Sequence, residues 1–185
     1  VSLAGGPLAA RLAEAGVPLA VIGKRWKLDL QAFWRLKQYV ARLQPDLIHT
    51  WMFAANTYGF AAGKTCGVRN LVVGQRCVDP WKSRLQLAVD RALAQRCSRV
   101  VVNSEGVRDF YVRHGAPVER VRVIPNGVAV PDPPATTRRQ LLAELNLPED
   151  SRLIGLVGRL WPQKRVKDAI WATDLLKVVR DNVHL

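Results

Sequence analysis

The stretch Val100-Val101-Val102-Asn103-Ser104-Glu105-Gly106-Val107 changes within a few residues from a run of β-branched side chains to the start of a helix. Consecutive valines favour a buried strand of a parallel sheet, and Ser104 is of a residue type that caps the first turn of a helix. The stretch therefore predicts a strand at Arg99–Val102 and a helix at Ser104–His114. Parallel strands need a crossover connection of this kind, so the fold class that it indicates is α/β.

The same alternation continues on both sides of this stretch. Short apolar runs predict further strands at Val17–Ile22, Leu47–His49, Leu71–Gly74 and Val121–Ile124. Helical periodicity predicts further helices at Pro7–Ala15, Leu28–Gln44, Met52–Lys64 and Ser83–Arg96. The buried face of the last of these helices is expected to carry Leu85, Ala88, Val89, Ala92 and Leu93. Together these elements predict a Rossmann-like parallel sheet with helices on both faces.

The proline-rich segment Val130-Pro131-Asp132-Pro133-Pro134 interrupts this pattern and is expected to be extended and exposed. Beyond it, the sequence predicts further elements at Thr137–Leu145 (helix), Leu153–Val157 (strand), Val166–Val179 (helix) and Val183–Leu185 (strand). We therefore expect an N-terminal Rossmann-like domain at 1–128, a linker and helix at 129–151, and the first βα unit of a second Rossmann-like domain at 152–185. The chain begins with neither an initiator Met nor a signal peptide, and we expect it to begin inside a longer protein.

Composition excludes several classes of protein. Of 185 residues, 49% are hydrophobic and 23% are charged, which is typical of a globular chain and not of a disordered or collagen-like one. No run reaches the roughly 20 apolar residues of a membrane span. Three cysteines, Cys66, Cys77 and Cys97, form no C-x-x-C pair, so we expect free thiols in a reducing, cytoplasmic compartment and no zinc site.

The chain is strongly basic, and most of the excess lies in the first domain. Lys and Arg number 28 against 15 Asp and Glu, a net charge of +13. Residues 1–127 hold 19 basic and 8 acidic residues, a net charge of +11. Several basic residues lie beside two tryptophans: Lys24, Arg25 and Lys27 beside Trp26, and Arg35 and Lys37 beside Trp34. This pattern predicts peripheral contact with an anionic membrane, and the alternative is that both tryptophans pack in the core.

Three motifs carry side chains suited to chemistry. His49 ends a predicted strand, and ligands of open α/β sheets bind at the carboxyl ends of the strands, so His49 is either a substrate contact or a packed histidine. The second motif joins the segments 100–107 and 123–128. In it, Ser104 is either a helix cap or part of an anion site, and Asn126 and Gly127 predict a tight turn with positive φ.

The third motif is Leu156-Val157-Gly158-Arg159-Leu160-Trp161-Pro162-Gln163-Lys164. Gly158 permits a close approach of backbone to a ligand. Arg159 and Lys164 lie in a loop between a predicted strand and a predicted helix, and two cations there suit a diphosphate. The alternative is that both are solvated surface charges.

In this order, D-x-x-H-T-W (46–51), V-N-S-E-x-V (102–107), V-I-P-N-G-V (123–128) and V-G-R-L-x-x-x-K (157–164) resemble motifs of the family 4 retaining glycosyltransferases of GT-B fold. The resemblance implies transfer of a sugar, with retention, from a nucleotide-diphosphate sugar to a hydroxyl of a cell-envelope or lipid-linked glycan, without a metal or another cofactor. It implies catalytic roles for His49, Arg159 and Lys164, with Gly158, Arg159 and Lys164 at the donor. Acceptor-side or sugar contacts are implied for Gln75, Arg76, Ser104 and Asn126.

The chain also departs from this family. The donor-domain motif E-x7-E is absent, Arg165 stands where a glycine usually follows the loop lysine, and Gln75 and Arg76 stand where many relatives carry a histidine. We therefore expect this chain alone to be inactive, and an unpaired sheet edge to favour a homodimer or an exchange of elements. The alternative function is a non-catalytic, basic Rossmann-like module that binds nucleic acid or a protein. Nucleic acid is not the expected partner, because no recognition motif is present.

Overall fold

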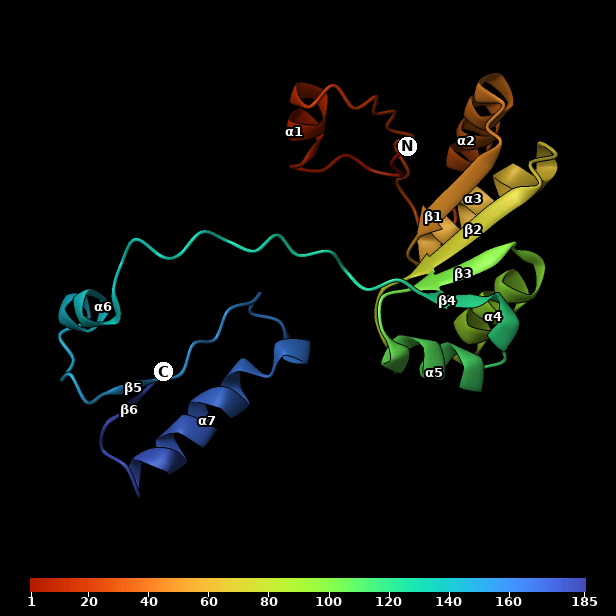
Figure 1. Ribbon diagram of the computed structural model, residues 1–185. Coiled ribbons are helices and arrows are strands. Elements are labelled where there is room, and N and C mark those ends of the chain that lie inside the picture. The colour runs from red at the N-terminus through yellow and green to blue at the C-terminus, as the bar shows by residue number, and fades with distance from the viewer. The chain divides into compact units, whose positions relative to one another are not determined.

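The computed structural model describes residues 1–185, which form two compact units, Val1–Val128 and Ala129–Leu185. The first unit is built on a parallel sheet in the order β1-β2-β3-β4 (Figure 1). Its strands are β1 (Leu47–Trp51), β2 (Asn70–Gln75), β3 (Arg99–Val102) and β4 (Val121–Val123). Its helices are α1 (Ala9–Glu14), α2 (Leu30–Leu43), α3 (Phe53–Thr65), α4 (Arg84–Arg96), α5 (Glu105–Arg113) and the short 3-10 turn η1 (Val118–Arg120). The α/β class and the parallel sheet are confirmed.

The helices of this unit begin where the local sequence can satisfy their free N–H groups. At the start of α4, the Ser83 hydroxyl accepts a 3.2 Å hydrogen bond from the N–H of Gln86, whose side chain accepts in return from the Ser83 N–H at 2.9 Å. At the start of α5, the Ser104 hydroxyl accepts a 3.4 Å hydrogen bond from the N–H of Val107. The carboxylate of Asp29 caps α2 in the same way. These three caps fix the residue at which α2, α4 and α5 begin.

The two faces of the sheet differ in their surroundings. Side chains alternate between the faces of a strand, and on one face Val73 and Val102 join a core with residues of α4 and α5. Helix α3 packs against β1 and β2. The opposite face carries Leu47, His49 and Trp51, which are all exposed. Helices α3, α4 and α5 thus pack on one face of the sheet, where helices on both faces were expected, and the face that carries His49 is open.

Two further expectations for this unit are wrong. Val17–Ile22 forms no strand: only Val21 pairs, in a single bridge with Ser2, because the partner segment bends directly after Ser2. The buried face of α4 is also rotated from the expected one, since Asp90 is buried and Leu85 is exposed. The cause is a polar network that draws Asp90 into the interior.

The second unit contains α6 (Arg138–Glu144), β5 (Arg152–Leu153), the 3-10 turn η2 (Pro162–Lys164), α7 (Val166–Lys177) and β6 (Val183–His184). Strands β5 and β6 pair in parallel. The strand expected at Leu153–Val157 ends at Leu153, because β6 offers only two residues for pairing. No helix in the structure combines the length and the apolarity that a membrane crossing requires.

Candidate functional site

A hollow of about 390 Å³ lies at the carboxyl end of the sheet in the first unit. Because the four strands are parallel, their carboxyl ends meet at this one edge. Side chains from all four strand ends reach the hollow: His49 and Trp51 from β1, Arg76 after β2, Asn103 after β3 and Asn126 after β4. The sheet therefore gathers residues that are far apart in the sequence, and His49, Arg76 and Asn126 were among those predicted.

Trp51 lies against the floor of this hollow. A Cβ atom added to Gly74 in β2 would collide with the Trp51 ring and would lie 2.8 Å from the carbonyl oxygen of Thr50. Only glycine at position 74 therefore lets the indole approach the backbone of β2 this closely. The His49 ring packs beside it, with the ring centroids 4.2 Å apart.

Arg76 joins this aromatic pair to β4. Its Cζ atom lies 5.4 Å from the centroid of the Trp51 ring, a cation–π contact, and its Nη2 donates a 2.7 Å hydrogen bond to Oδ1 of Asn126. The tight turn expected at Asn126 and Gly127 is wrong, because neither residue has a positive φ. The extended backbone after Pro125 instead presents the Asn126 side chain to Arg76. The guanidinium has no acidic partner at the hollow, since the side chain that accepts its hydrogen bond is a neutral amide.

His49 lies two residues before the end of β1 rather than at its end as predicted. Although the face that carries His49 is open, partial desolvation of its ring lowers the pKa of His49 below its ordinary value of 6.5. The imidazole is therefore neutral near pH 7, and a neutral imidazole can accept a proton or a hydrogen bond from a hydroxyl group.

Gln75 does not belong to this site, although it was predicted to. Successive residues of a strand point to opposite faces, so Gln75 points into the interior and Arg76 into the hollow. The Gln75 side chain is buried, donates a 3.0 Å hydrogen bond to Oδ1 of Asp90, and accepts one of 3.1 Å from the hydroxyl of Tyr111.

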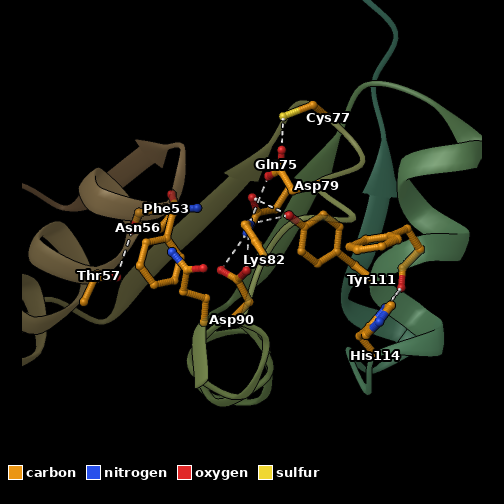
Figure 2. A network of polar contacts seen from close by, with 12 residues as sticks. Phe53, Asn56, Thr57, Gln75, Cys77, Asp79, Lys82, Asp90, Tyr111 and His114 are labelled. Carbon is orange, nitrogen blue, oxygen red and sulfur yellow. Dashed lines mark hydrogen bonds and ion pairs between the residues drawn. The ribbon is translucent and has the colours of Figure 1, made fainter. Parts of the chain in front are cut away.

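Lys82 is the centre of the network that holds Gln75 (Figure 2). Its Nζ atom lies 2.8 Å from Oδ2 of Asp90, 3.2 Å from Oδ2 of Asp79 and 2.7 Å from the hydroxyl of Tyr111. Burial opposes the charge of Lys82, but the hydrogen bonds to Asp90 and Tyr111 raise its pKa above the ordinary value. Burial also raises the pKa of Tyr111 to about 12. The network ties the loop after β2, which begins with Arg76, to α4 and α5.

Ser104 acts as a helix cap and does not line the hollow. Its neighbour Asn103 does, and the Oδ1 atom of Asn103 is buried without a hydrogen-bond partner in the structure. Such an acceptor is available to a donor group of a ligand. We did not predict Asn103 and Trp51 as site residues from the sequence. Their positions at the carboxyl ends of β3 and β1 could have indicated them, because ligands of such sheets bind at that edge.

In the second unit, Lys164 folds back on Gly158. A Cβ atom at Gly158 would lie 3.7 Å from Cγ of Lys164, so the alkyl chain of the lysine lies along the glycine. Arg159 and Lys164 are both exposed, and neither forms an ion pair with an acidic side chain. Arg165, which follows, has φ +50° and forms an ion pair with Asp168. This left-handed conformation favours glycine. It gives a physical reason why the family usually has a glycine at the position that Arg165 occupies here.

The structure brings together no group of three or more His, Cys, Asp or Glu side chains that could hold a metal ion. All three cysteines are free thiols. The expectation that the reaction needs no metal stays a prediction.

Residues 2–130 match the family model of Glycosyltransferase Family 4. The chain therefore belongs to this family, as the four motifs predicted. A search of curated proteins finds no relative of the sequence.

Among solved structures, the chain resembles the Anabaena protein Alr3699/HepE. The crystal structure of that protein in complex with UDP-glucose matches with a TM-score of 0.75 and 23% identity, over 98% of this chain and 50% of that one. Its complex with UDP and glucose matches with a TM-score of 0.73 and 23% identity, over 92% and 48% of the two chains. The likeness shows a shared fold, and this chain spans about half the length of the Anabaena protein.

Proposed function

We propose that this chain is part of a cytoplasmic glycosyltransferase that moves a sugar from a nucleotide-diphosphate sugar to a hydroxyl group of a cell-envelope or lipid-linked glycan, with retention of configuration. The observation that carries this proposal is the family match over residues 2–130. It is supported by the likeness to a protein whose crystal structures hold UDP and UDP-glucose. A uridine-type sugar nucleotide is accordingly the first donor to test.

In this proposal, Arg159 and Lys164 bind the donor diphosphate beside Gly158. Both side chains are exposed and have no acidic partner, so their charges are available to an anion. Breaking the bond between the anomeric carbon and the diphosphate oxygen leaves negative charge on the diphosphate, and fixed cations stabilise that charge without a metal ion. The residues thereby lower the barrier more than they tighten ground-state binding.

The hollow of the first unit is the proposed acceptor side. A neutral His49 can accept the hydrogen of an acceptor hydroxyl, and Arg76 presents a positive charge over Trp51. Trp51 is 41% exposed and offers apolar ring atoms against which a sugar can pack. Asn103 and Asn126 supply amide groups that can hydrogen-bond to hydroxyls.

The test uses a protein that carries the complete donor-binding half, because this chain spans about half of its structural relative. We expect Lys164→Ala to lower the turnover number by about 100-fold, comparable to the loss of one oxyanion donor. Arg159→Lys should also lower it, because a point charge does not replace a planar fork. Lys177→Ala, an exposed lysine at the end of α7, is the matched control. Wild-type turnover in Lys164→Ala would refute the proposed role.

The alternative function, a basic binding module, makes a different prediction for the chain itself. Saturation-transfer NMR with UDP-glucose should give a signal that Lys164→Ala weakens. Salt-sensitive binding of an RNA oligomer, with no signal from UDP-glucose, would favour the binding module instead. We expect no turnover by this chain alone, since much of the rate of such a reaction comes from orienting both substrates.

A further inference from the structure

Four large apolar side chains are exposed where the chain leads into α2. Trp26 is 73% exposed, Leu28 is 89%, Leu30 is 76% and Trp34 is 55%. With the basic residues between and beside them they form one surface, residues 24–37, which we call the α2 surface. Neither tryptophan packs in the core, so the alternative considered from the sequence does not hold.

The fold holds these side chains outward. Helix α2 buries Ala32, Leu36 and Val40, whereas Leu30 and Trp34, which are four residues apart, share another side of the helix. The helix therefore meets its own core with one face and presents Leu30 and Trp34 to solvent with another.

Hydrogen bonds also hold the loop before α2, which carries Trp26 and Leu28, in place. The Asp29 carboxylate accepts a 3.0 Å hydrogen bond from the N–H of Arg25, and the Asp29 N–H donates a 2.6 Å hydrogen bond to the hydroxyl of Tyr58. On the other side, the Arg35 guanidinium donates to the carbonyl oxygens of Ile22 and Gly23 at 2.9 and 3.0 Å. The exposure of Trp26 and Leu28 is thus built into an anchored loop.

The charge of the α2 surface has one sign. It contains Lys24, Arg25, Lys27, Arg35 and Lys37, and none of these five forms an ion pair. The only acidic residue between positions 15 and 45 is Asp29, which is buried and occupied as a helix cap. Lys37 lies with its Nζ atom 4.8 Å from the Trp34 ring, so a cation and an aromatic ring are presented together.

We propose that the α2 surface docks on an anionic lipid bilayer. Its cations match the negative charge of acidic headgroups, and tryptophan favours the boundary between headgroups and acyl chains. The two exposed leucines, Leu28 and Leu30, favour a bilayer over a nucleic acid as the partner. Aliphatic side chains gain free energy by entering an acyl layer but have no comparable partner on a polynucleotide, where recognition relies on phosphate contacts and aromatic stacking.

The test is co-sedimentation of the full chain with vesicles of phosphatidylcholine and phosphatidylglycerol at a ratio of three to one. We expect binding that weakens in 0.5 M salt, with at least 100-fold weaker binding to pure phosphatidylcholine. Because each basic residue near the surface contributes about fivefold, Arg25→Gln with Lys27→Gln should weaken binding by about 30-fold. Lys167→Gln with Lys177→Gln in α7 changes the net charge equally and should leave binding within twofold.

A second pair of variants tests the apolar part. Trp26→Ser with Leu28→Ser should weaken vesicle binding by at least tenfold, whereas Trp171→Ser, which removes an equally exposed tryptophan from α7, should not. These side chains are exposed, so the variants should fold normally, and circular dichroism checks this. Equal binding to neutral vesicles, equal losses in the α7 controls, or binding to an RNA oligomer alone would overturn the proposal.

Discussion

The Nη2 atom of Arg76 donates a 2.7 Å hydrogen bond to Oδ1 of Asn126, which joins the end of β2 to the segment after β4 across the intervening strand β3. The two residues are separated by 50 positions in the sequence. Both are exposed, so the bond contributes little to folding and instead fixes a guanidinium at the mouth of the hollow. Variants of this pair should therefore separate function from stability.

We expect Asn126→Ala to change the free energy of unfolding by less than about 0.5 kcal/mol, because exposed substitutions of this kind are nearly neutral. In the complete glycosyltransferase it should lower transfer about tenfold, the value of one hydrogen bond to a charged group. Urea unfolding and a transfer assay measure the two effects, with Asn70→Ala, an exposed asparagine at the first position of β2, as control. A loss of stability that matched the loss of transfer would contradict the assignment.

The buried network around Lys82 should be essential to the first unit. Lys82→Met leaves Asp90 buried without its cation, which should lower the free energy of unfolding by about 3 kcal/mol. The additional change Asp90→Leu should restore at least half of this loss, since the unpaired charge is then removed. Arg84→Met, at the neighbouring exposed position, is the control. An unchanged urea midpoint in Lys82→Met would show that the network contributes nothing.

The same network predicts a pH dependence. The pKa of Lys82 is raised in the folded state, so its contribution is fully present below its unfolded pKa of 10.5 and is lost as the pH rises through the folded pKa. Wild-type stability should therefore fall above about pH 10.5 more steeply than that of the Lys82→Met, Asp90→Leu variant. Urea midpoints measured between pH 8 and 11.5 test this, and parallel curves would contradict it.

Two glycines should respond to alanine in opposite ways. Gly74→Ala places a methyl group against Trp51 and should cost about 1–3 kcal/mol, with a change in tryptophan fluorescence as the indole moves. Gly106→Ala in α5 meets open space and should stabilise the protein by up to about 1 kcal/mol. If both substitutions destabilised the protein, the contact between residue 74 and Trp51 would not be the cause of the loss in Gly74→Ala.

His49 should titrate below pH 6.5, because burial lowers its pKa. Trp51→Ala removes the ring that packs against it at 4.2 Å and should move the pKa of His49 back toward 6.5. NMR titration of the imidazole carbon-bound protons gives both values, and His49→Gln identifies the resonance. A pKa that does not change in Trp51→Ala would mean that other groups desolvate His49.

The outer edge of β1 is unpaired, since β1 ends the sheet order and Val17–Ile22 does not join it. We expect the chain to self-associate at high concentration, as a free edge favours pairing between copies. Leu47→Lys, an exposed position on β1, should shift light scattering toward the monomer, whereas Leu85→Lys on α4 should not. A clean monomer in the wild type would refute this prediction.

The sequence by itself determined the elements whose signals are local. Consecutive valines predicted β3 at its observed bounds, and Ser83 and Ser104 marked the starts of α4 and α5, because a strand of a parallel sheet and a capped first turn depend on residues only a few positions apart. Motif order also predicted the family, and the resemblance implied roles for His49, Arg76 and Asn126. In the structure these three residues lie at one edge, since parallel strands all end on the same side.

The tertiary structure decided what each side chain faces. Gln75 and Arg76 are adjacent in sequence, yet one is buried against Asp90 and the other lines the hollow, because the side-chain alternation depends on where the strand begins. Likewise, Asp90 interrupts an otherwise amphipathic helix, and its burial is favourable because Gln75 of β2 and Lys82 of the loop before α4 both form hydrogen bonds with it. Contacts of this kind depend on segments brought together by the sheet, which no local pattern encodes.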